Sequence, residues 1–310
     1  MVQTIKYMLC ALLISPLAPA LGQVQTPAPY NSGKKINHTR TWYAVAPEQN
    51  ASSLVTRPTS DVKQMTTYSD GLGRPLQTVF KQGSLATGDS AIDFVVAHIY
   101  DTLGREQYRY LPFAANSTGS NASISDGLFK LNPFQQDSVF NKRQFPQEIY
   151  YYAKVIFEMS PLNRTLEQYA PGNSWAGSES LTDTLRRRVQ MQYFSNTTAD
   201  SVRKWSITNV SDSLGTYTSA GIYAAGELHK VIAIDEHGKQ VVTYSDKMGQ
   251  LLLKKVQLMS TSDTGAGKGH VGWLCTYYLY DELNLLRAML PPKAIESILG
   301  TWSFTSDVLN

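Results

Sequence analysis

The stretch TTYSDGLGRPLQTV (residues 66–79) contains an aromatic residue, an Asp and then Leu-Gly-Arg, and the stretch IYDTLGREQYRYLP (residues 99–112) repeats that pattern. Four later segments vary it. At the position of the Gly in Leu-Gly-Arg, all six copies carry Gly or Asn, namely Gly73, Gly104, Asn163, Gly238, Gly249 and Asn284. Gly and Asn enter the left-handed backbone region at the lowest cost, so this position requires a positive φ. The pattern predicts one tight turn, used repeatedly.

A side-chain oxygen acceptor precedes the Gly or Asn by three residues in every copy. Five copies have Asp70, Asp101, Asp235, Asp246 and Asp281, and the third has Ser160. Such a side chain accepts a hydrogen bond from the backbone N–H two residues on and holds a turn that closes a hairpin. We expect hairpin corners, with the preceding aromatic packed into the sheet and the following basic residue pointing outward. A calcium site is excluded, because each turn offers one carboxylate and calcium needs several oxygen ligands.

The rest of the chain is typical of an all-β protein. It has 310 residues, of which 42% are apolar and 17% charged, enough for a sizeable core. Apolar and polar residues alternate in EQYRYLP (106–112), RVQMQYF (188–194) and VRKWSI (202–207), as in half-buried strands. Only PPKAIESILG (291–300) predicts a helix, with prolines in its first turn and Gly300 after its end. We therefore predict mainly antiparallel, hairpin-rich sheets with one short helix near the C-terminus.

The N-terminus has the features of a secretory signal peptide. Lys6 precedes an apolar run over residues 7–17, and small residues lead up to Gly22. The run is too short to span a membrane, and no later segment is long enough. We predict cleavage after Gly22 and an extracellular, cell-surface or periplasmic protein. Residues 23–40 are expected to be a flexible lead-in, residues 41–215 a β-rich module, and residues 216–310 further hairpins.

Charge and cysteine content narrow the possible functions. The formal charge is +3 and the Lys and Arg residues are scattered, so we predict no nucleic-acid partner. The cluster Arg186 to Arg188 is expected at a solvated strand edge. After the signal peptide Cys275 is the only cysteine, which excludes an internal disulfide or a cysteine metal site. Alternation places Cys275 on one face with Tyr277 and Leu279, as a small buried residue.

No segment carries a convincing catalytic or cofactor motif. Ser174 lies in GNSWAG, where Ala176 replaces the second Gly of a nucleophile elbow. Lys268 lies in TGAGKGH, which lacks the first Gly and the final Ser or Thr of a phosphate loop. His229 and His237 form only a loose pair on separate expected elements. We predict a protein that is not an enzyme and that has no cofactor and no metal site. An alternative is glycan binding, with exposed Trp175 or Trp273 stacking on sugar rings.

The turns and their flanking strings resemble a known family. DGLGRPLQTV (70–79), YDTLGREQYRYLPF (100–113), VIFEMSPLNRTLEQYAPGNSW (155–175), GELHKVIAIDEHGKQVVTYSDKMGQLLLKK (226–255) and YYLYDELNLLRAMLPPKAIES (277–297) are similar to the N-terminal domain that precedes the YD repeats in Bacteroidota-type Rhs proteins. The resemblance covers roughly residues 40–297, nearly all of the mature chain.

The resemblance carries expectations about architecture and partners. In that family tandem YD hairpins wind into a hollow β shell that encloses an effector or serves surface contact, and the N-terminal domain has no catalytic residues to transfer. The sequence ends at Asn310, where the repeat array is expected to begin, so we expect a first module without its repeats. The partners implied are the rest of an Rhs shell or, in the alternative, cell-surface glycans, and the oligomeric state stays open.

Overall fold

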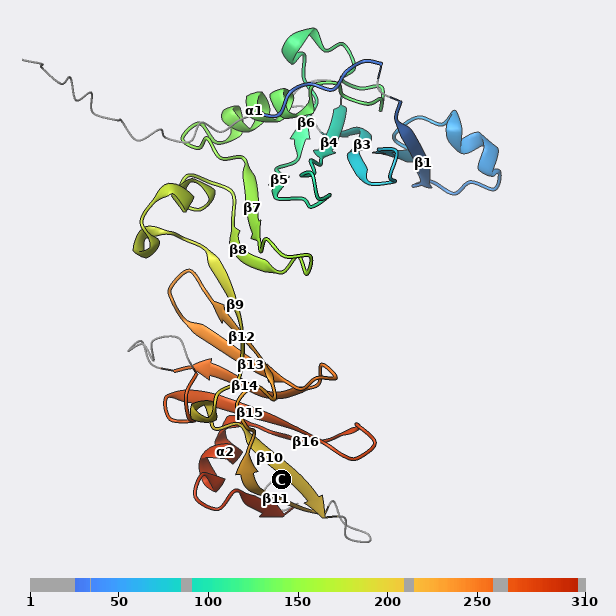
Figure 1. Ribbon diagram of the computed structural model, residues 1–310. Helices are drawn as coiled ribbons and strands as arrows, with labels where there is room; N and C mark the ends of the chain where they lie inside the picture. The colour runs from blue at the N-terminus through green and yellow to red at the C-terminus, as the bar shows by residue number, and fades with distance from the viewer. Residues whose placement is uncertain (1–25, 34, 85–90, 209–214, 259–266, 306–310) are drawn as a thin grey trace, which may run out of the picture.

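The computed structural model describes residues 26–33, 35–84, 91–208, 215–258 and 267–305 (Figure 1). The predicted signal peptide lies outside these ranges. Within them are seventeen strands, two α-helices and five short 3₁₀ segments, and all strand pairs are antiparallel. The prediction of a mainly antiparallel all-β fold is confirmed. No helix in the described ranges is long and apolar enough to cross a membrane.

The first sheet lies near the N-terminus and is covered by a helix. Its order is β1-β2-β3-β4-β6, with β1 (Asn37–Ala44), β2 (Val62–Ser69), β3 (Pro75–Ser84), β4 (Ile92–Ala97) and β6 (Phe113–Ala114). Helix α1 (Pro133–Gln144) contacts β6 and β4, and Phe134 on α1 packs with Val79 and Val95 in their core. Strand β1 begins at Asn37, inside the stretch expected to be a lead-in, because its backbone pairs with β2 along its whole length.

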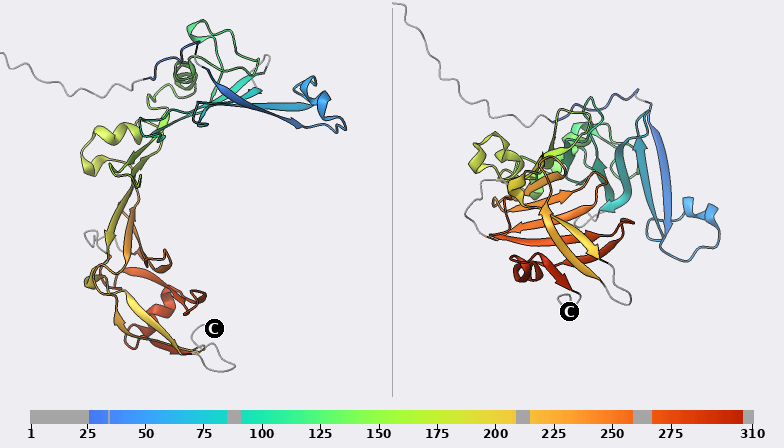
Figure 2. Two further views of the ribbon diagram at one scale, coloured as in Figure 1. Left: turned by 45° about the vertical axis from the view of Figure 1, so that its right-hand side comes forward. Right: turned by 60° about the horizontal axis from the view of Figure 1, so that its bottom comes forward.

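Nine strands form the second sheet, and they follow one another almost in sequence order. From one edge to the other they are β16 (Leu286–Leu290), β15 (Trp273–Tyr280), β14 (Leu251–Gln257), β13 (Gln240–Ser245), β12 (His229–Ile234), β9 (Val189–Ser195), β8 (Thr165–Tyr169), β7 (Tyr152–Phe157) and β5 (Tyr108–Tyr110). Figure 2 shows that the two sheets together form a crescent, with the first sheet at one tip and the later strands toward the other.

A third, smaller sheet covers the C-terminal end of the crescent. It has the order β10-β11-β17, with β10 (Arg203–Thr208), β11 (Thr216–Ile222) and β17 (Ser303–Thr305). Strands β10 and β11 are an insertion between the paired strands β9 and β12. Together with α2 (Pro292–Ile298) they bury the largest core of the protein. The domain boundary expected at 215/216 falls between β10 and β11, which pair with each other.

The short 3₁₀ segments lie in connecting loops. They are η1 (Ala51–Val55), η2 (Thr118–Ser120), η3 (Ala176–Ser180), η4 (Asp183–Leu185) and η5 (Thr198–Asp200). Two of them, η3 and η4, lie between β8 and β9. These loops therefore interrupt the strand order without adding a further layer of regular structure.

Some local predictions hold and others do not. Cys275, Tyr277 and Leu279 are all buried on one face of β15, and α2 lies where the helix was predicted. Helix α1 was not predicted, because its buried face includes polar residues, among them Gln136 and Asp137, so the apolar helical period is missing.

The arginine cluster is also placed differently from the expectation. Strand β9 pairs with a strand on each side, so the residues that precede it do not lead into a sheet edge. Arg188 is buried between the carboxylates of Glu167 and Asp183, at 3.1 and 2.6 Å. The prediction of a solvated strand edge was wrong for Arg188, because these two acidic side chains pair with it.

Candidate functional site

The repeated turns share one hydrogen-bonding arrangement, seen first in the Asp101 turn. There Oδ1 of Asp101 accepts from the backbone N–H groups of Leu103 and Arg105, at 2.9 and 2.8 Å. The N–H of Asp101 donates to the carbonyl of Arg105, and the N–H of Gly104 donates to the carbonyl of Asp101. The Asp70, Asp235, Asp246 and Asp281 turns repeat all four bonds. The predicted role of the aspartates agrees with this geometry.

The Gly and Asn residues of all six turns have the predicted positive φ. The angles are 79° at Gly73, 78° at Gly104, 51° at Asn163, 78° at Gly238, 83° at Gly249 and 62° at Asn284. This backbone conformation turns the chain back toward its starting strand, so the carboxylate can reach two successive donors. Because the backbone N–H of Leu285 donates to its carboxylate, the pKa of Asp281 lies below its ordinary value.

The Ser160 turn reaches the same result with two side chains. Ser160 Oγ accepts from the N–H of Leu162 at 3.1 Å, as Asp does in the other turns. The role of binding the arginine passes to Glu158, whose carboxylate accepts from Arg164 Nε and Nη2 at 3.0 and 2.8 Å. The backbone hydrogen bond that closes this hairpin lies farther from the tip of the turn than in the other copies. Here the N–H of Glu158 donates to the carbonyl of Arg164. This substitution preserves the turn and lengthens it.

Two of the basic residues of the turns, Arg74 and Arg105, do not point outward as predicted. Arg74 Nε donates to Asp70 Oδ2 at 2.8 Å, and the Arg74 guanidinium lies 4.8 Å from the ring centroid of Tyr100, just before the Asp101 turn. Arg105 makes the corresponding two contacts in the next turn. It pairs with Asp101 at 2.8 Å, and its guanidinium lies 5.2 Å from the ring centroid of Phe157.

Each of these arginines thus connects its own turn with the next one. Arg105 Nη1 also donates to the Glu158 carbonyl at 3.2 Å. Arg164 continues the series over Tyr193 of β9, at 4.5 Å. Further along, Gln250 Nε2 of the Asp246 turn donates to the Asn284 carbonyl of the Asp281 turn at 3.3 Å. The turns therefore form a ladder of contacts that runs from the first sheet into the second.

The aromatic residues before the turns divide into two groups. Tyr68 and Tyr244, two residues before their Asp, are buried, as predicted. Tyr100 and Tyr280 precede their Asp directly and are half-buried, because successive side chains of a strand point to opposite faces. The ring of Tyr100 packs against the Arg74 guanidinium instead. The Asp101 turn also differs from a simple hairpin corner, because it joins β4 of one sheet to β5 of the other through a single bridge between His98 and Arg109.

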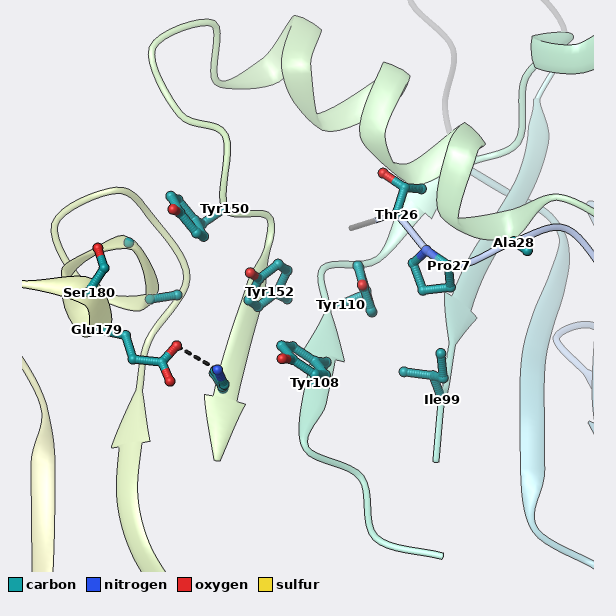
Figure 3. Close-up of a pocket in the computed structure, with 13 residues that line it drawn as sticks. Thr26, Pro27, Ala28, Ile99, Tyr108, Tyr110, Tyr150, Tyr152, Glu179 and Ser180 are labelled. Carbon is teal, nitrogen blue, oxygen red and sulfur yellow. Dashed lines mark hydrogen bonds and ion pairs between the residues drawn. The ribbon is translucent and has the colours of Figure 1, made fainter. Parts of the chain in front are cut away.

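A groove of about 730 Å³ lies beside β5 and β7, where the two sheets meet. Figure 3 shows Tyr108, Tyr110, Tyr150 and Tyr152 along it, with Glu179 at one end. Tyr108 and Tyr152 meet edge to face, with ring centroids 5.1 Å apart. The groove therefore offers aromatic faces and hydroxyl groups together.

One ion pair supplies the charge of this tyrosine groove. Lys154 Nζ lies 2.5 Å from Glu179 Oε2 and 5.3 Å from the ring centroid of Tyr108. Burial lowers the pKa of Lys154, but hydrogen bonding to Glu179 outweighs this, and the net pKa is raised. Lys154 is therefore a charged hydrogen-bond donor at neutral pH, next to the tyrosine rings.

A second polar cluster is enclosed in the C-terminal core. Lys255 Nζ donates to three backbone carbonyls, those of Asp200, Gly267 and Gly269, at 2.8, 2.7 and 2.5 Å. Nearby, His270 Nε2 lies 2.9 Å from the hydroxyl of Tyr277, and burial lowers the pKa of His270 to about 3. The bonds of Lys255 tie β14 to η5 and to the loop before β15. Within the described ranges no group of three or more His, Cys, Asp or Glu residues is placed to hold a metal.

The structure separates the other residues that the sequence singled out. Ser174 and Lys268 are exposed in loops, and His229 and His237 lie at opposite ends of β12. Trp273, which the glycan-binding alternative would need exposed, is buried in the C-terminal core, because it begins the inward-facing set of β15. Trp175 is half-buried, with the Arg187 guanidinium 5.4 Å from its ring centroid.

The tyrosine groove was not found from the sequence. Its tyrosines lie on β5, β7 and the loop between α1 and β7, and only their alternation on β5 was visible. Alternation identified one face of one strand but not the strand beside it. The groove becomes recognisable only when the pairing of β5 with β7 is known.

Part of the chain is similar to a domain family of unknown function. Residues 40–189, just under half of the chain, match the model described as domain of unknown function DUF6443. No curated protein matches.

Several solved structures are similar to the chain at low identity. Crystal structures of TcdB2-TccC3, without and with Cdc42, match with a TM-score of 0.42 and 14% identity, over 77% of this chain and 9% of the other. A structure of the Photorhabdus luminescens Tc holotoxin pore matches with a TM-score of 0.40 and 13% identity, over the same shares. The chain spans about a tenth of the length of these proteins.

Proposed function

We propose that the chain is an exported, non-enzymatic structural or interaction module of an Rhs/YD-repeat protein of the Bacteroidota type. The ladder of turns carries this proposal. Similar turns, three of which reach the next turn through an arginine or glutamine side chain, join hairpins of two sheets into one curved wall. Such repetition has an architectural purpose, because each copy adds two strands to a surface and none adds a reactive group.

Two further features support the proposal. The match of residues 40–189 to a domain model agrees with a modular protein. Strand β16 ends the nine-stranded sheet, and within the described ranges its outer side pairs with no strand, so a further strand of a shell could extend the wall there. The side chains of Leu286 and Met289 on β16 are more than half exposed, as expected for a surface that packs against additional structure.

The test is to isolate the tagged full chain from intact cells of its source after chemical cross-linking. The expected result is a mature chain that begins at Gln23, in the exported fraction, linked to a polypeptide rich in aromatic-Asp-x-x-Gly-Arg turns. The Met289→Lys variant should lose this link, because a charge on an edge strand discourages pairing. Its matched control, Val271→Lys, lies away from β16 and should keep it. A chain that stays in the cytoplasm with residues 1–22 attached would contradict the export, and an exported chain without such a partner would contradict the module.

A second candidate function, glycan binding, is favoured by the tyrosine groove rather than by tryptophans. Aromatic faces stack on sugar rings, and the Lys154–Glu179 pair and the tyrosine hydroxyls offer hydrogen bonds to sugar hydroxyls. Calorimetry against a panel of oligosaccharides tests this. Binding that is lost in Tyr150→Ala and kept in Tyr43→Ala, an exposed tyrosine outside the groove, would support it. Equal binding by both variants, or none by the wild type, would reject it.

A further inference from the structure

The residue before the Gly or Asn of the turns is unusually apolar for its position at a loop tip. In five of the six turns it is Leu or Met: Leu72, Leu103, Leu162, Met248 and Leu283, exposed by 68% to 79%. Turn positions of this kind ordinarily hold polar residues. The exception is the Asp235 turn, which has His237, with a side chain 70% exposed. The six tips are thus equally accessible and differ in chemistry.

The strand directions sort the same turns into two groups. Because neighbouring strands are antiparallel, the turns after β2, β4, β7, β13 and β15 all lie on one rim of the crescent. The turn after β12 lies on the opposite rim. The contacts Arg74–Tyr100 and Gln250–Asn284 confirm that successive turns of the first rim touch. All five apolar tips therefore lie on this rim, and the one histidine tip lies on the other.

These five tips, which we call the tip row, have a regular spacing. Two strands separate successive hairpins, and strands lie about 4.8 Å apart, so neighbouring tips are roughly 10 Å apart. One tip is missing from the row where β9 and β12 reach this rim, because the β10–β11 insertion leaves the sheet there. The row therefore has a fixed repeat with one gap and follows the curvature of the crescent.

Ion pairs within the turns reduce the cost of contact along the tip row. Four of its five turns have a carboxylate that is paired with an arginine of the same turn or hairpin: Asp70 with Arg74, Asp101 with Arg105, Glu158 with Arg164, and Asp281 with Arg287. At these four positions a second surface would cover paired carboxylates and not lone ones, which lowers the main cost of burying ionised groups. The rim thus combines five protruding apolar tips with four turns that each hold an arginine–carboxylate pair.

We propose that the tip row is an interface between two copies of this chain, which pair rim to rim across a two-fold axis. Two identical rims have the same repeat and the same curvature, so the tips of one copy fit between the tips of the other, as a self-complementary interface requires. The surface of a different protein would have to match both the repeat and the curvature of the rim. The five tips offer on the order of 500 Å² of apolar area per copy at about 100 Å² each. Together with the turn backbones between the tips, the area buried per copy approaches the roughly 800 Å² per partner of a standard interface.

Sedimentation velocity of the full chain at concentrations from about 1 to 200 μM tests the proposal, a range in which standard interfaces of modest affinity dissociate. The wild type should shift from monomer to dimer. The triple variant Leu72→Lys, Leu103→Lys, Leu162→Lys should weaken the dimer at least tenfold, because it places like charges opposite each other. Its circular dichroism and Tm should stay close to wild type, since these side chains pack against little of their own chain. The matched control is Val271→Lys, an 88% exposed apolar residue on the opposite rim, which should leave the dimer intact.

Three outcomes would overturn the proposal. The wild type could remain monomeric over the whole range, the triple variant could dimerise as well as the wild type, or Val271→Lys could dissociate the dimer equally. Flotation with phosphatidylcholine vesicles is measured in parallel. A monomeric wild type that floats with vesicles, while the triple variant does not, would assign the tip row to a lipid surface and not to a second copy.

Discussion

The covered end of the nine-stranded sheet and its uncovered middle are built from the same kind of strand but are stabilised differently. In β15, every second residue is buried, because β10, β11 and α2 lie over that face. In β9 no residue is fully buried, and the core beside β7 and β8 consists of Tyr152, Tyr169 and Ala176. The middle strands therefore depend more on the turn ladder at their rim than on a core. This difference predicts unequal responses to substitution.

The largest effect is expected at Tyr277, in the covered region. Tyr277→Ala should lower the free energy of unfolding by about 3–5 kcal/mol, since it leaves a cavity beside Trp205 and Trp302. It also removes the hydroxyl that accepts from the N–H of Arg203 and contacts His270. Denaturant unfolding followed by tryptophan fluorescence measures this. Tyr278→Ala, on the other face of β15, is the control. Equal losses for both variants would mean that the cover over β15 contributes little.

A pH-dependent effect is expected at the other covered end, in α1. Burial raises the pKa of Asp137 to about 8, and its Oδ1 accepts a hydrogen bond from Asn141 Nδ2 at 2.7 Å. The folded state therefore favours the protonated form, so stability is fully present below the unfolded pKa of about 4 and is lost as the pH rises toward 8.

The variant Asp137→Asn should remove this loss and be more stable than the wild type at pH 9 by about 1–3 kcal/mol. Urea unfolding at pH 5, 7 and 9 gives the comparison, with Asp126→Asn as control. Asp126 is 40% exposed and its pKa is lowered, so that variant should gain nothing at high pH. Parallel pH curves for wild type and Asp137→Asn would contradict the prediction.

A smaller effect is expected at the turn ladder of the middle region. Arg105→Ala removes the pair with Asp101, the bond to the Glu158 carbonyl and the contact with Phe157. The loss should be about 1–2 kcal/mol. Hydrogen exchange should locate it in β5, β7 and β8, while β13 to β15 stay protected. Lys239→Ala, at the same position of the Asp235 turn, is the matched control. Uniform loss of protection across the sheet would show that the stabilisation from the Arg105 contacts is not local.

The smallest effect is expected from the backbone of a single turn. Gly238 has a φ of 78° and open space around its missing Cβ, so Gly238→Ala should cost about 1 kcal/mol through conformation alone. Gly71, in the Asp70 turn, also has open space but no positive φ, and Gly71→Ala should be neutral or slightly stabilising. Thermal unfolding distinguishes the two. A neutral Gly238→Ala would mean that the turn tolerates another backbone conformation.

The local chemistry of the turns was predictable, whereas their connections were not. Asp101 and Gly104 act within five residues of each other, so spacing along the chain was enough to predict their bonds. The partner of Arg105 beyond its own turn, Phe157, lies more than fifty residues away, and no periodicity connects them. The burial of Trp273 was not predictable for the same reason: an adjacent Gly-rich loop left exposure open, and cover from another part of the chain decided burial.

The sequence by itself determined the all-β class, the position and φ of each turn, the helix α2 and the inward face of β15. These depend on short-range sterics, hydrogen bonds between near neighbours and a two-residue period. Only the tertiary structure decided which strands are covered, that five apolar tips share one rim, and that four tyrosines meet in a groove. Those features depend on strand order and direction, which bring together residues that are far apart in the chain and carry no common local signal.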